Sequence, residues 1–249
     1  MAQQRRLVLD GTAGIRQAEG GVDRSALVQD HRPALRALDG PGDAIRVRRA
    51  CKRALDVIAS GLALIVLLPV AMLIALAIVL DSPGSPFFVH VRIGRFGAPF
   101  GVLKFRTMRR DAQDRLDHYL ATRHDLRQQW ASGFKLVDDP RVTRVGRVLR
   151  RWSLDEVPQF LNVLLGSMSL VGPRPVTPAE APYFGSDLPL VLSVRPGLTG
   201  LWAVSGRSDL PYRDRAALEA GYVRDWSVGR DLSILLRTVP AVIGRRGAW

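Results

Sequence analysis

The longest apolar stretch of the chain covers residues 57–80, VIASGLALIVLLPVAMLIALAIVL, and contains no charged residue. As a helix it would be about 36 Å long, which is enough to cross a hydrocarbon core of about 30 Å. Its fifteen Leu, Ile and Val residues favour membrane insertion by roughly 5–9 kcal/mol in total. This exceeds the roughly 3 kcal/mol cost of a proline inside a helix. The pattern therefore predicts a segment that enters the membrane.

Pro69 lies at the middle of this stretch and divides it into halves of about 18 Å, each too short to cross the membrane. Basic residues flank the stretch on both sides, and such residues tend to keep both ends in the cytoplasm. They are Arg46, Arg48, Arg49, Lys52, Arg53, Arg92 and Arg95. A re-entrant helix-break-helix hairpin over residues 46–81 satisfies both observations, and a tilted span kinked at Pro69 fits them about equally well.

The pattern after the apolar stretch changes to that of a small β-hairpin. An apolar strand over residues 87–92 is followed by turn glycines and a second strand over 100–106. Residues 109–131 are charged with an apolar stripe at helical spacing. Apolar positions recur at helical spacing in 232–243, with Arg237 among them and Arg245 and Arg246 just beyond. This pattern predicts a helix that either lies on an anionic membrane surface or packs against the core. The predicted fold class is α+β, mostly helical.

Composition divides the chain into three parts. Residues 1–45 mix Gly, Asp, Arg and Ala without sustained periodicity and are predicted to be a disordered cytoplasmic tail. The membrane hairpin follows at 46–81, and residues 82–249 form a cytoplasmic catalytic domain that ends in the interfacial helix. With a single cysteine, the chain carries no disulfide framework and suits a reducing compartment.

The balance of 36 basic against 23 acidic residues gives a formal charge of +13. It predicts anionic partners, which are nucleic acid, acidic lipid headgroups or phosphorylated small molecules. All but three of the basic residues are arginines, which suits bidentate phosphate contacts, although a GC-rich genome produces the same bias.

Residues 138–175 combine closely spaced arginines with two adjacent carboxylates, Asp155 and Glu156. On a helix, the spacing of the arginines places several guanidiniums on one side, where an anionic substrate would meet them. The series consists of Arg141, Arg144, Arg147, Arg150 and Arg151, and Arg174 follows in a Gly-Pro-Arg-Pro turn. Residues 153–156 also have the form of a capping box, S-L-D-E, which begins a helix. The two interpretations are compatible, because a carboxylate at a helix N-terminus stays ionised where phosphate also binds.

The order of the motifs in this chain resembles the monotopic phosphoglycosyl transferases, also called bacterial sugar transferases. The resemblance covers the chain from residue 52 to its end. It is carried by KRALD at 52–56, RIG at 92–94, KFRTM at 104–108, DDPRVTRVG at 138–146, SLDEVPQ at 153–159, GPRP at 172–175, RPGLTG at 195–200 and SGRSD at 205–209. The last segments resemble the branch that initiates exopolysaccharide or O-antigen synthesis, in its short form without an N-terminal four-helix bundle.

The resemblance implies a membrane hairpin that breaks at Pro69 and a location in the inner membrane with the catalytic domain on the cytoplasmic face. It implies transfer of a hexose 1-phosphate from a UDP-sugar to undecaprenyl phosphate, with Mg²⁺ as cofactor and release of UMP. Asp155 would be the nucleophile that forms a covalent phosphosugar intermediate. Glu156 would assist through the metal, which both carboxylates would hold, or through proton transfer. The residues predicted to bind phosphate are Lys104, Arg106, Arg150 and Arg174.

Three positions depart from the family pattern. Leu68 stands where a serine often precedes the hairpin proline, Ser167 where an aspartate is usual, and Ala203 where glutamine is common. A transferase that has lost its activity and acts as a scaffold is therefore one alternative. Another is a non-catalytic, membrane-tethered basic protein that binds nucleic acid or acidic lipid. The carboxylates inside the arginine cluster and the few aromatic residues argue against a nucleic-acid partner. A homo-oligomer is compatible with the sequence.

Overall fold

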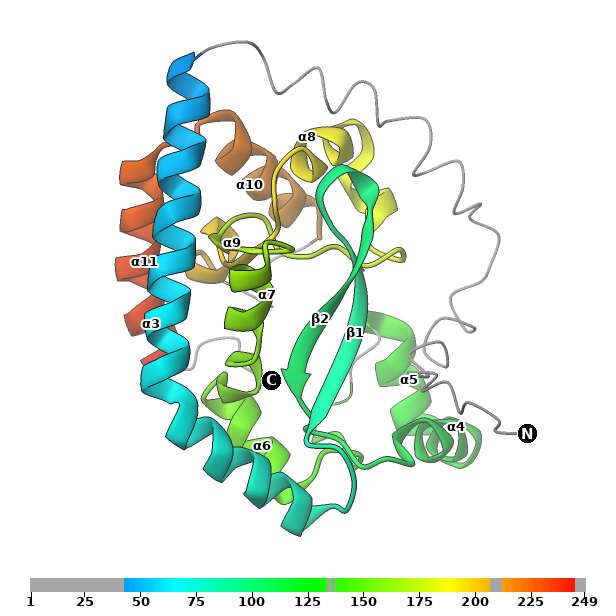
Figure 1. The fold of residues 1–249 in the computed structure, drawn as a ribbon. Coiled ribbons are helices and arrows are strands. Elements are labelled where there is room, and N and C mark those ends of the chain that lie inside the picture. Colours follow the sequence, from blue (N-terminus) through cyan, green and yellow to red (C-terminus); the bar gives the residue numbers. More distant parts are fainter. Residues whose placement is uncertain (1–42, 134–135, 137, 207–211, 245–249) are drawn as a thin grey trace, which may run out of the picture.

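A computed structural model describes residues 43–133, 136, 138–206 and 212–244 (Figure 1). The predicted tail, residues 1–45, lies outside the described residues except for its last three, which belong to the first turn of a helix. Residues 207–209 of the predicted SGRSD motif also lie outside them.

The apolar stretch forms the longest element, helix α3 (Asp43–Asp81), with 39 residues. Pro69 lies inside this helix, and Figure 1 shows the helix bending in its C-terminal third. A proline removes one backbone hydrogen bond and crowds the preceding turn, which accounts for a bend. The structure confirms one helix that is long and apolar enough to cross a membrane, and the expected break is a bend within it.

The first half of α3 is fastened to the rest of the protein by charged side chains. Lys52 Nζ forms an ion pair with Asp231 at 2.6 Å and donates a hydrogen bond to the carbonyl of Val171 at 2.9 Å. Asp56 is buried and accepts a hydrogen bond from Ser169 Oγ at 2.7 Å. The two charged ends of the KRALD motif therefore have a structural role in docking the helix.

The second half of α3 docks through apolar residues. Ile74 and Ile78 are buried in a cluster with Phe105 and Leu149, from the hairpin and a later helix. Asp81 at the end of α3 accepts a hydrogen bond from the backbone of that same later helix. Between the two docked ends, many large apolar side chains are more than half exposed. They include Leu62, Ile65, Val66, Leu68, Leu73 and Leu76.

The predicted β-hairpin is confirmed. Strands β1 (Phe87–Ile93) and β2 (Pro99–Phe105) pair antiparallel, and the turn contains the 3₁₀ helix η2 (Arg95–Gly97). The turn glycine Gly97 has φ of +76°, a conformation that glycine adopts without the penalty other residues incur. Figure 1 shows the hairpin as a long twisted ribbon at the centre of the molecule.

The remaining elements surround the hairpin. The predicted helical region 109–131 is two helices, α4 (Ala112–Thr122) and α5 (His124–Gly133). The arginine series leads into α6 (Arg144–Arg151), η3 (Leu154–Glu156) and α7 (Gln159–Leu165). A second, parallel strand pair, β3 (Ser169–Val171) with β4 (Gly197–Thr199), was not predicted. The last elements are η4 (Ala181–Asp187), α8 (Leu188–Leu192), α9 (Leu201–Val204), α10 (Tyr212–Arg224) and α11 (Val228–Ile243).

Helix α11 presents two apolar faces. Ile234 on one face is buried in a core cluster with residues of α7, β3 and α10. The other face carries large apolar residues at helical spacing that are more than half exposed, namely Leu232, Leu236, Val239 and Ile243. Core packing therefore accounts for only one side of α11. In Figure 1 the helix lies beside the first half of α3, to which the Lys52–Asp231 ion pair joins it.

Candidate active site

Lys104 on β2 brings the two predicted carboxylates together. Its Nζ lies 2.7 Å from Glu156 Oε1 and 3.5 Å from Asp155 Oδ2. The Asp155 side chain is largely buried, at 13% exposed, whereas that of Glu156 is 39% exposed. The structure thus joins three of the sequence-predicted site residues at one end of the hairpin.

A tight turn between α6 and η3 directs these two carboxylates toward Lys104. Ser153 adopts a left-handed conformation, with φ of +55°, and its side chain makes no capping hydrogen bond. The capping-box interpretation is therefore wrong, because Glu156 points to Lys104 instead of back to Ser153. The turn η3 has only three residues, too few for a helix dipole to hold Asp155 ionised. A left-handed conformation of a residue other than glycine costs roughly 1–2 kcal/mol, and such strain is concentrated at functional sites.

Of the arginine series, Arg150 is the residue that reaches these carboxylates. Its Nε donates a hydrogen bond to Thr107 Oγ1 at 2.9 Å, and its charge acts on Asp155. Arg141 is instead buried and paired with Asp139 at 2.6 Å. The three other members, Arg144, Arg147 and Arg151, are exposed on α6. The helical spacing of the arginines therefore places one guanidinium in the site.

Burial raises the pKa of Asp155. The charges of Lys104 and Arg150 oppose this shift, and the neighbouring Glu156 carboxylate adds to it. Two carboxylates of like charge in adjacent positions each disfavour ionisation of the other. A cationic ligand or substrate group that approaches them would relieve this repulsion.

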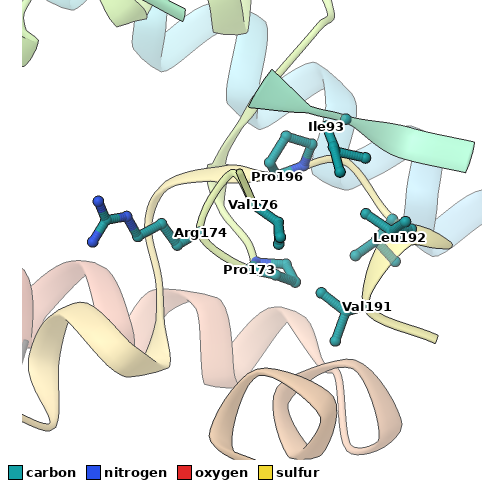
Figure 2. A pocket seen from close by; sticks show the side chains of 9 residues that line it. Ile93, Pro173, Arg174, Val176, Val191, Leu192 and Pro196 are labelled. Atoms are coloured by element: carbon teal, nitrogen blue, oxygen red, sulfur yellow. The ribbon is translucent and has the colours of Figure 1, made fainter. Parts of the chain in front are cut away.

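Arg174 lies on a loop that two backbone segments hold rigidly. Gly172 N–H donates to the carbonyl of Thr199, and Gly197 N–H donates to that of Pro173. A Cβ on Gly197 would lie 2.2 Å from the Gly172 nitrogen, so the GPRP and RPGLTG motifs need glycine where they cross. Figure 2 shows the Arg174 side chain directed away from the small apolar pocket that this loop covers.

The Arg174 guanidinium stacks on Trp202, 4.6 Å from the ring centroid. Within the described part of the chain it makes no hydrogen bond or ion pair with a carboxylate. Burial and the nearby charge of Arg215 lower the pKa of Arg174. A half-buried cation whose folded surroundings disfavour its charge is suited to receive an anion.

Three residues that the sequence did not single out for the site surround Arg174. Glu180 at the start of η4 lies 3.1 Å from Arg215 Nη1 and 3.5 Å from Arg92 Nη1. Arg215 also lies over the Trp202 ring, at 5.0 Å. Arg92 was noted as a charge flanking the membrane stretch and as the first residue of the RIG motif, but not as a site residue. The spacing of Thr177 and Glu180, which form a reciprocal pair of hydrogen bonds, is the one local signal that could have drawn attention to Glu180.

The electrostatics of this second group differ from those near Asp155. Burial and the charges of Arg174 and Arg215 lower the pKa of Arg92 to about 10. Although burial opposes it, the pKa of Glu180 is lowered to about 2 by Arg174 and Arg215. Burial and the charge of Arg92 lower the pKa of His90 to about 4, so His90 is neutral at pH 7. The positive charge of the group is therefore carried by guanidiniums.

Other sequence-predicted positions lie away from this cluster. The guanidinium of Arg106 donates hydrogen bonds to the backbone carbonyls of Ser82 and Pro83, at the exit of α3. The structure does not bring it together with Lys104 and Asp155. Ser167, one of the departures from the family pattern, exchanges hydrogen bonds with Asn162 at the end of α7. Its place in the fold is structural.

The predicted metal position has two carboxylates. No group of three or more His, Cys, Asp or Glu side chains that could hold a metal ion occurs among the described residues. Magnesium usually takes one or two protein carboxylates and completes its shell with water and substrate phosphates. Asp155 and Glu156 fit that donor set, and a metal there would compete with Lys104 for both carboxylates.

Glu219 on α10 provides a test of the buried electrostatics below Arg174. It is 1% exposed, and its Oε1 accepts a hydrogen bond from the Arg174 backbone N–H at 3.0 Å. Burial raises the pKa of Glu219 from 4.5 to about 7. Below pH 4.5 the carboxyl is protonated in both the folded and unfolded states. Between pH 4.5 and 7 it ionises only in the unfolded state, so stability falls by about 3 kcal/mol as the pH rises.

We expect Glu219→Gln to remove this pH-dependent loss. The thermal midpoint of the variant relative to the parent should rise by on the order of 5–10 °C between pH 4 and pH 8 in the same detergent. Asp214→Asn, which changes an exposed carboxylate of the same helix, is the matched control and should show no such rise. Parallel curves for the Glu219→Gln variant and the parent would contradict the predicted linkage.

Comparisons with known proteins agree with the family that the motifs indicate. A family model described as bacterial sugar transferase matches residues 47–245. Over 198 residues the chain is 44% identical to the exopolysaccharide production protein ExoY of Rhizobium meliloti, with 80% of this chain and 88% of that protein covered. It is 43% identical over 206 residues to the UDP-glucose:undecaprenyl-phosphate glucose-1-phosphate transferase of Caulobacter vibrioides, with 80% and 72% covered.

A third relative is the undecaprenyl-phosphate galactose phosphotransferase of Salmonella typhimurium, 41% identical over 204 residues. The match covers 82% of this chain but 43% of the Salmonella protein, so the chain spans less than half the length of that relative. The family model covers most of the chain, and the relatives exceed 40% identity. The chain therefore belongs to the bacterial sugar transferase family, which confirms the family and the transferase class that its motifs predicted.

Proposed function

We propose that this chain transfers a sugar 1-phosphate from a UDP-sugar to a polyprenyl phosphate and releases UMP, as the first membrane step of exopolysaccharide or O-antigen synthesis. The names of its relatives support the donor, the acceptor and the pathway. The observation that carries the proposal is the placement of Asp155 and Glu156 against Lys104, with Arg150 and the open guanidinium of Arg174 nearby. Carboxylates inside a phosphate-binding cluster suit phosphoryl transfer better than simple polyanion binding.

The proposed reaction has two displacements at one phosphorus. An oxygen of Asp155 bonds to the sugar-linked phosphorus while the bond from that phosphorus to the bridging oxygen breaks, and UMP leaves with the bond's electrons. An oxygen of the polyprenyl phosphate then attacks the same phosphorus and releases Asp155. One phosphoanhydride replaces another, so the reaction needs no separate energy source.

The residues of the site have distinct roles in this scheme. Lys104 and Arg150 neutralise charge on the phosphate that Asp155 attacks. Glu156, the more exposed carboxylate, would share a Mg²⁺ ion with Asp155, and that ion would supply further neutralisation of the diphosphate. Asp155 must be ionised to attack, and its raised pKa means that the rate should fall as the pH is lowered through that pKa.

We further propose that α3 enters the membrane and returns to the same side. The part of the chain that follows α3 contacts the first half of this helix at Lys52 and Asp56 and the second half at Ile74 and Ile78. A helix that crossed the bilayer would carry these two halves to opposite sides, about 30 Å apart, where one domain could not meet both. The exposed apolar residues between the contacts, with the exposed stripe of α11, would lie in the lipid.

The topology leads to a labelling prediction. With Cys51 replaced by serine, single cysteines at Val47 and Ala98, both exposed positions, should resist an impermeant thiol reagent in intact spheroplasts. Both should react after the membrane is permeabilised, which is the accessibility control. Labelling of one position but not the other in intact spheroplasts would show that α3 crosses the membrane.

The activity itself is tested with purified full-length protein in detergent. A panel of UDP-sugars is supplied with Mg²⁺ and undecaprenyl phosphate, and both UMP and the lipid-linked sugar product are measured. We expect one sugar to give equal amounts of the two products. Absence of UMP release with every sugar, from protein that is folded by its thermal transition, would overturn the proposed function.

A further inference from the structure

The second arginine group lies on the same face of the hairpin as Lys104. Residues directly opposite each other in an antiparallel pair project to one face, and the register pairs Phe88 with Lys104 and Arg92 with Phe100. Arg92 and Lys104 therefore belong to one face, separated along the strands by four residues, or about 13 Å. Lys104 lies near Asp155, and Arg92 lies near Glu180. The side chains of the two groups adjoin, because Glu156, which contacts Lys104, also acts on the charges of Arg92 and Arg174.

Glu180 is the residue that draws the guanidiniums together. Its carboxylate forms ion pairs with Arg92 and Arg215. The guanidiniums of Arg215 and Arg174 both stack on the Trp202 ring. The side chains of Arg92, Glu180 and Arg215 are 14%, 12% and 5% exposed. Three buried or half-buried guanidiniums repel one another. Burial first, and this repulsion after it, lower the pKa values of Arg92 and Arg174. An anion placed between Arg92 and Arg174 would relieve it.

We infer that Arg92 and Arg174 bind the nucleotide-linked phosphate of the donor, and that Glu180 is the positioning residue that holds this second phosphate subsite together. The inference rests on the proposed function and gives each of the two bonded donor phosphates its own set of cationic side chains. The sugar-linked phosphate lies beside Lys104, Arg150 and Asp155. The phosphate of the departing UMP lies beside Arg92 and Arg174.

The chemistry of the first displacement explains why the two subsites are separate. The attacking and leaving oxygens lie roughly in line on opposite sides of the phosphorus, so the departing phosphate is directed away from Asp155. As the bond breaks, the bridging oxygen keeps the electron pair and the UMP phosphate gains negative charge. The guanidiniums of Arg92 and Arg174, which adjoin Glu156, meet this charge where it develops, and a bidentate arginine contact fits phosphate geometry.

The same geometry gives Glu180 an indirect role. Its carboxylate accepts hydrogen bonds from the backbone and side chain of Thr177, which fixes it relative to the loop that carries Arg174. It thereby holds Arg92 directly and Arg174 through the Arg215–Trp202 contact. Loss of its charge would leave the guanidiniums free to separate, and the phosphate subsite would lose its alignment.

The test is equilibrium binding of radiolabelled UMP to the full-length protein in detergent, together with the donor KM and kcat. We expect Glu180→Gln to weaken UMP binding by about tenfold and to raise the donor KM more than it lowers kcat. Arg92→Gln should weaken UMP binding at least as much. Asp187→Asn, which removes another arginine-paired carboxylate of η4 outside the site, should bind UMP within twofold of the parent. Lys104→Gln should slow formation of the covalent intermediate between Asp155 and the sugar phosphate (the adduct). It should bind UMP within about threefold of the parent.

The outcomes separate this inference from the proposed function. If the parent forms the adduct and releases UMP, but Glu180→Gln and Arg92→Gln bind UMP as the parent does, the second subsite is overturned. The assignment of the two phosphates is overturned if Lys104→Gln weakens UMP binding more than Arg92→Gln does. A parent that releases no UMP would instead refute the function. Should Glu180→Gln fail to fold by its thermal transition, Arg92→Gln and Arg92→Lys decide the matter, since a lysine keeps the charge but not the bidentate contact.

Discussion

Replacement of Asp155 by asparagine is expected to abolish the covalent step. Parent enzyme given its UDP-sugar and Mg²⁺ without lipid acceptor should release about one equivalent of UMP and gain the mass of a sugar phosphate. Asp155→Asn should lose both signals, with turnover lower by on the order of 10⁴-fold or more, because a neutral amide is a poor nucleophile. Burst kinetics of UMP release and intact-protein mass spectrometry measure the two signals.

Glu156→Gln serves as the comparison for this variant. Glu156 is three times as exposed as Asp155, at 39% against 13%, and forms the shorter contact with Lys104. Its replacement should slow the reaction yet leave the adduct detectable, because Glu156 positions charge and does not form the bond. Turnover of Asp155→Asn close to the parent rate would refute the two-step scheme and favour direct attack by the lipid phosphate.

The extent to which the sequence predicted the fold depends on the length of each pattern. A run of 24 uncharged residues and two strands of seven residues repeat their signal several times, and α3 and the hairpin were predicted close to their observed bounds. Strands β3 and β4 have three residues each, too few to show alternation. Their pairing depends on the crossing of Gly172 and Gly197, which are 25 positions apart and meet only in the folded chain.

Residues of the candidate site were singled out from the sequence where motifs are local, and were missed where the site is assembled from distant segments. Asp155 and Glu156 are adjacent in sequence, but S-L-D-E also fits a capping box. The left-handed conformation of Ser153 and the contact of Glu156 with Lys104 distinguish the two interpretations. Arg106 shares a motif with Lys104 yet binds the end of α3. Glu180 and Arg215 are 35 residues apart and carry no shared motif, so their ion pair could not be inferred from spacing.

Arg174 provides the second large effect. Arg174→Ala is expected to lower turnover by about 10²–10³-fold, the range found when one donor to a developing anion is removed. The guanidinium stacks on Trp202 and makes no carboxylate contact within the described residues, so its positive charge is available to substrate. Arg174→Lys should also be impaired by at least about tenfold, because an ammonium group neither stacks on the indole in the same way nor forms a bidentate phosphate contact.

Removal of the Arg174 side chain should impair catalysis without impairing stability. Burial and the charge of Arg215 lower the pKa of Arg174, so the folded state disfavours this charge, and its removal should not reduce the thermal midpoint through electrostatics. Arg147→Ala, which changes an exposed arginine of α6, is the matched control and should retain both turnover and stability. Initial rates of UMP release and thermal transitions, measured for all three variants in one detergent, provide the comparison. Near-normal turnover of Arg174→Ala would remove Arg174 from the subsite for the UMP phosphate, and a large loss of stability would show that its role is structural.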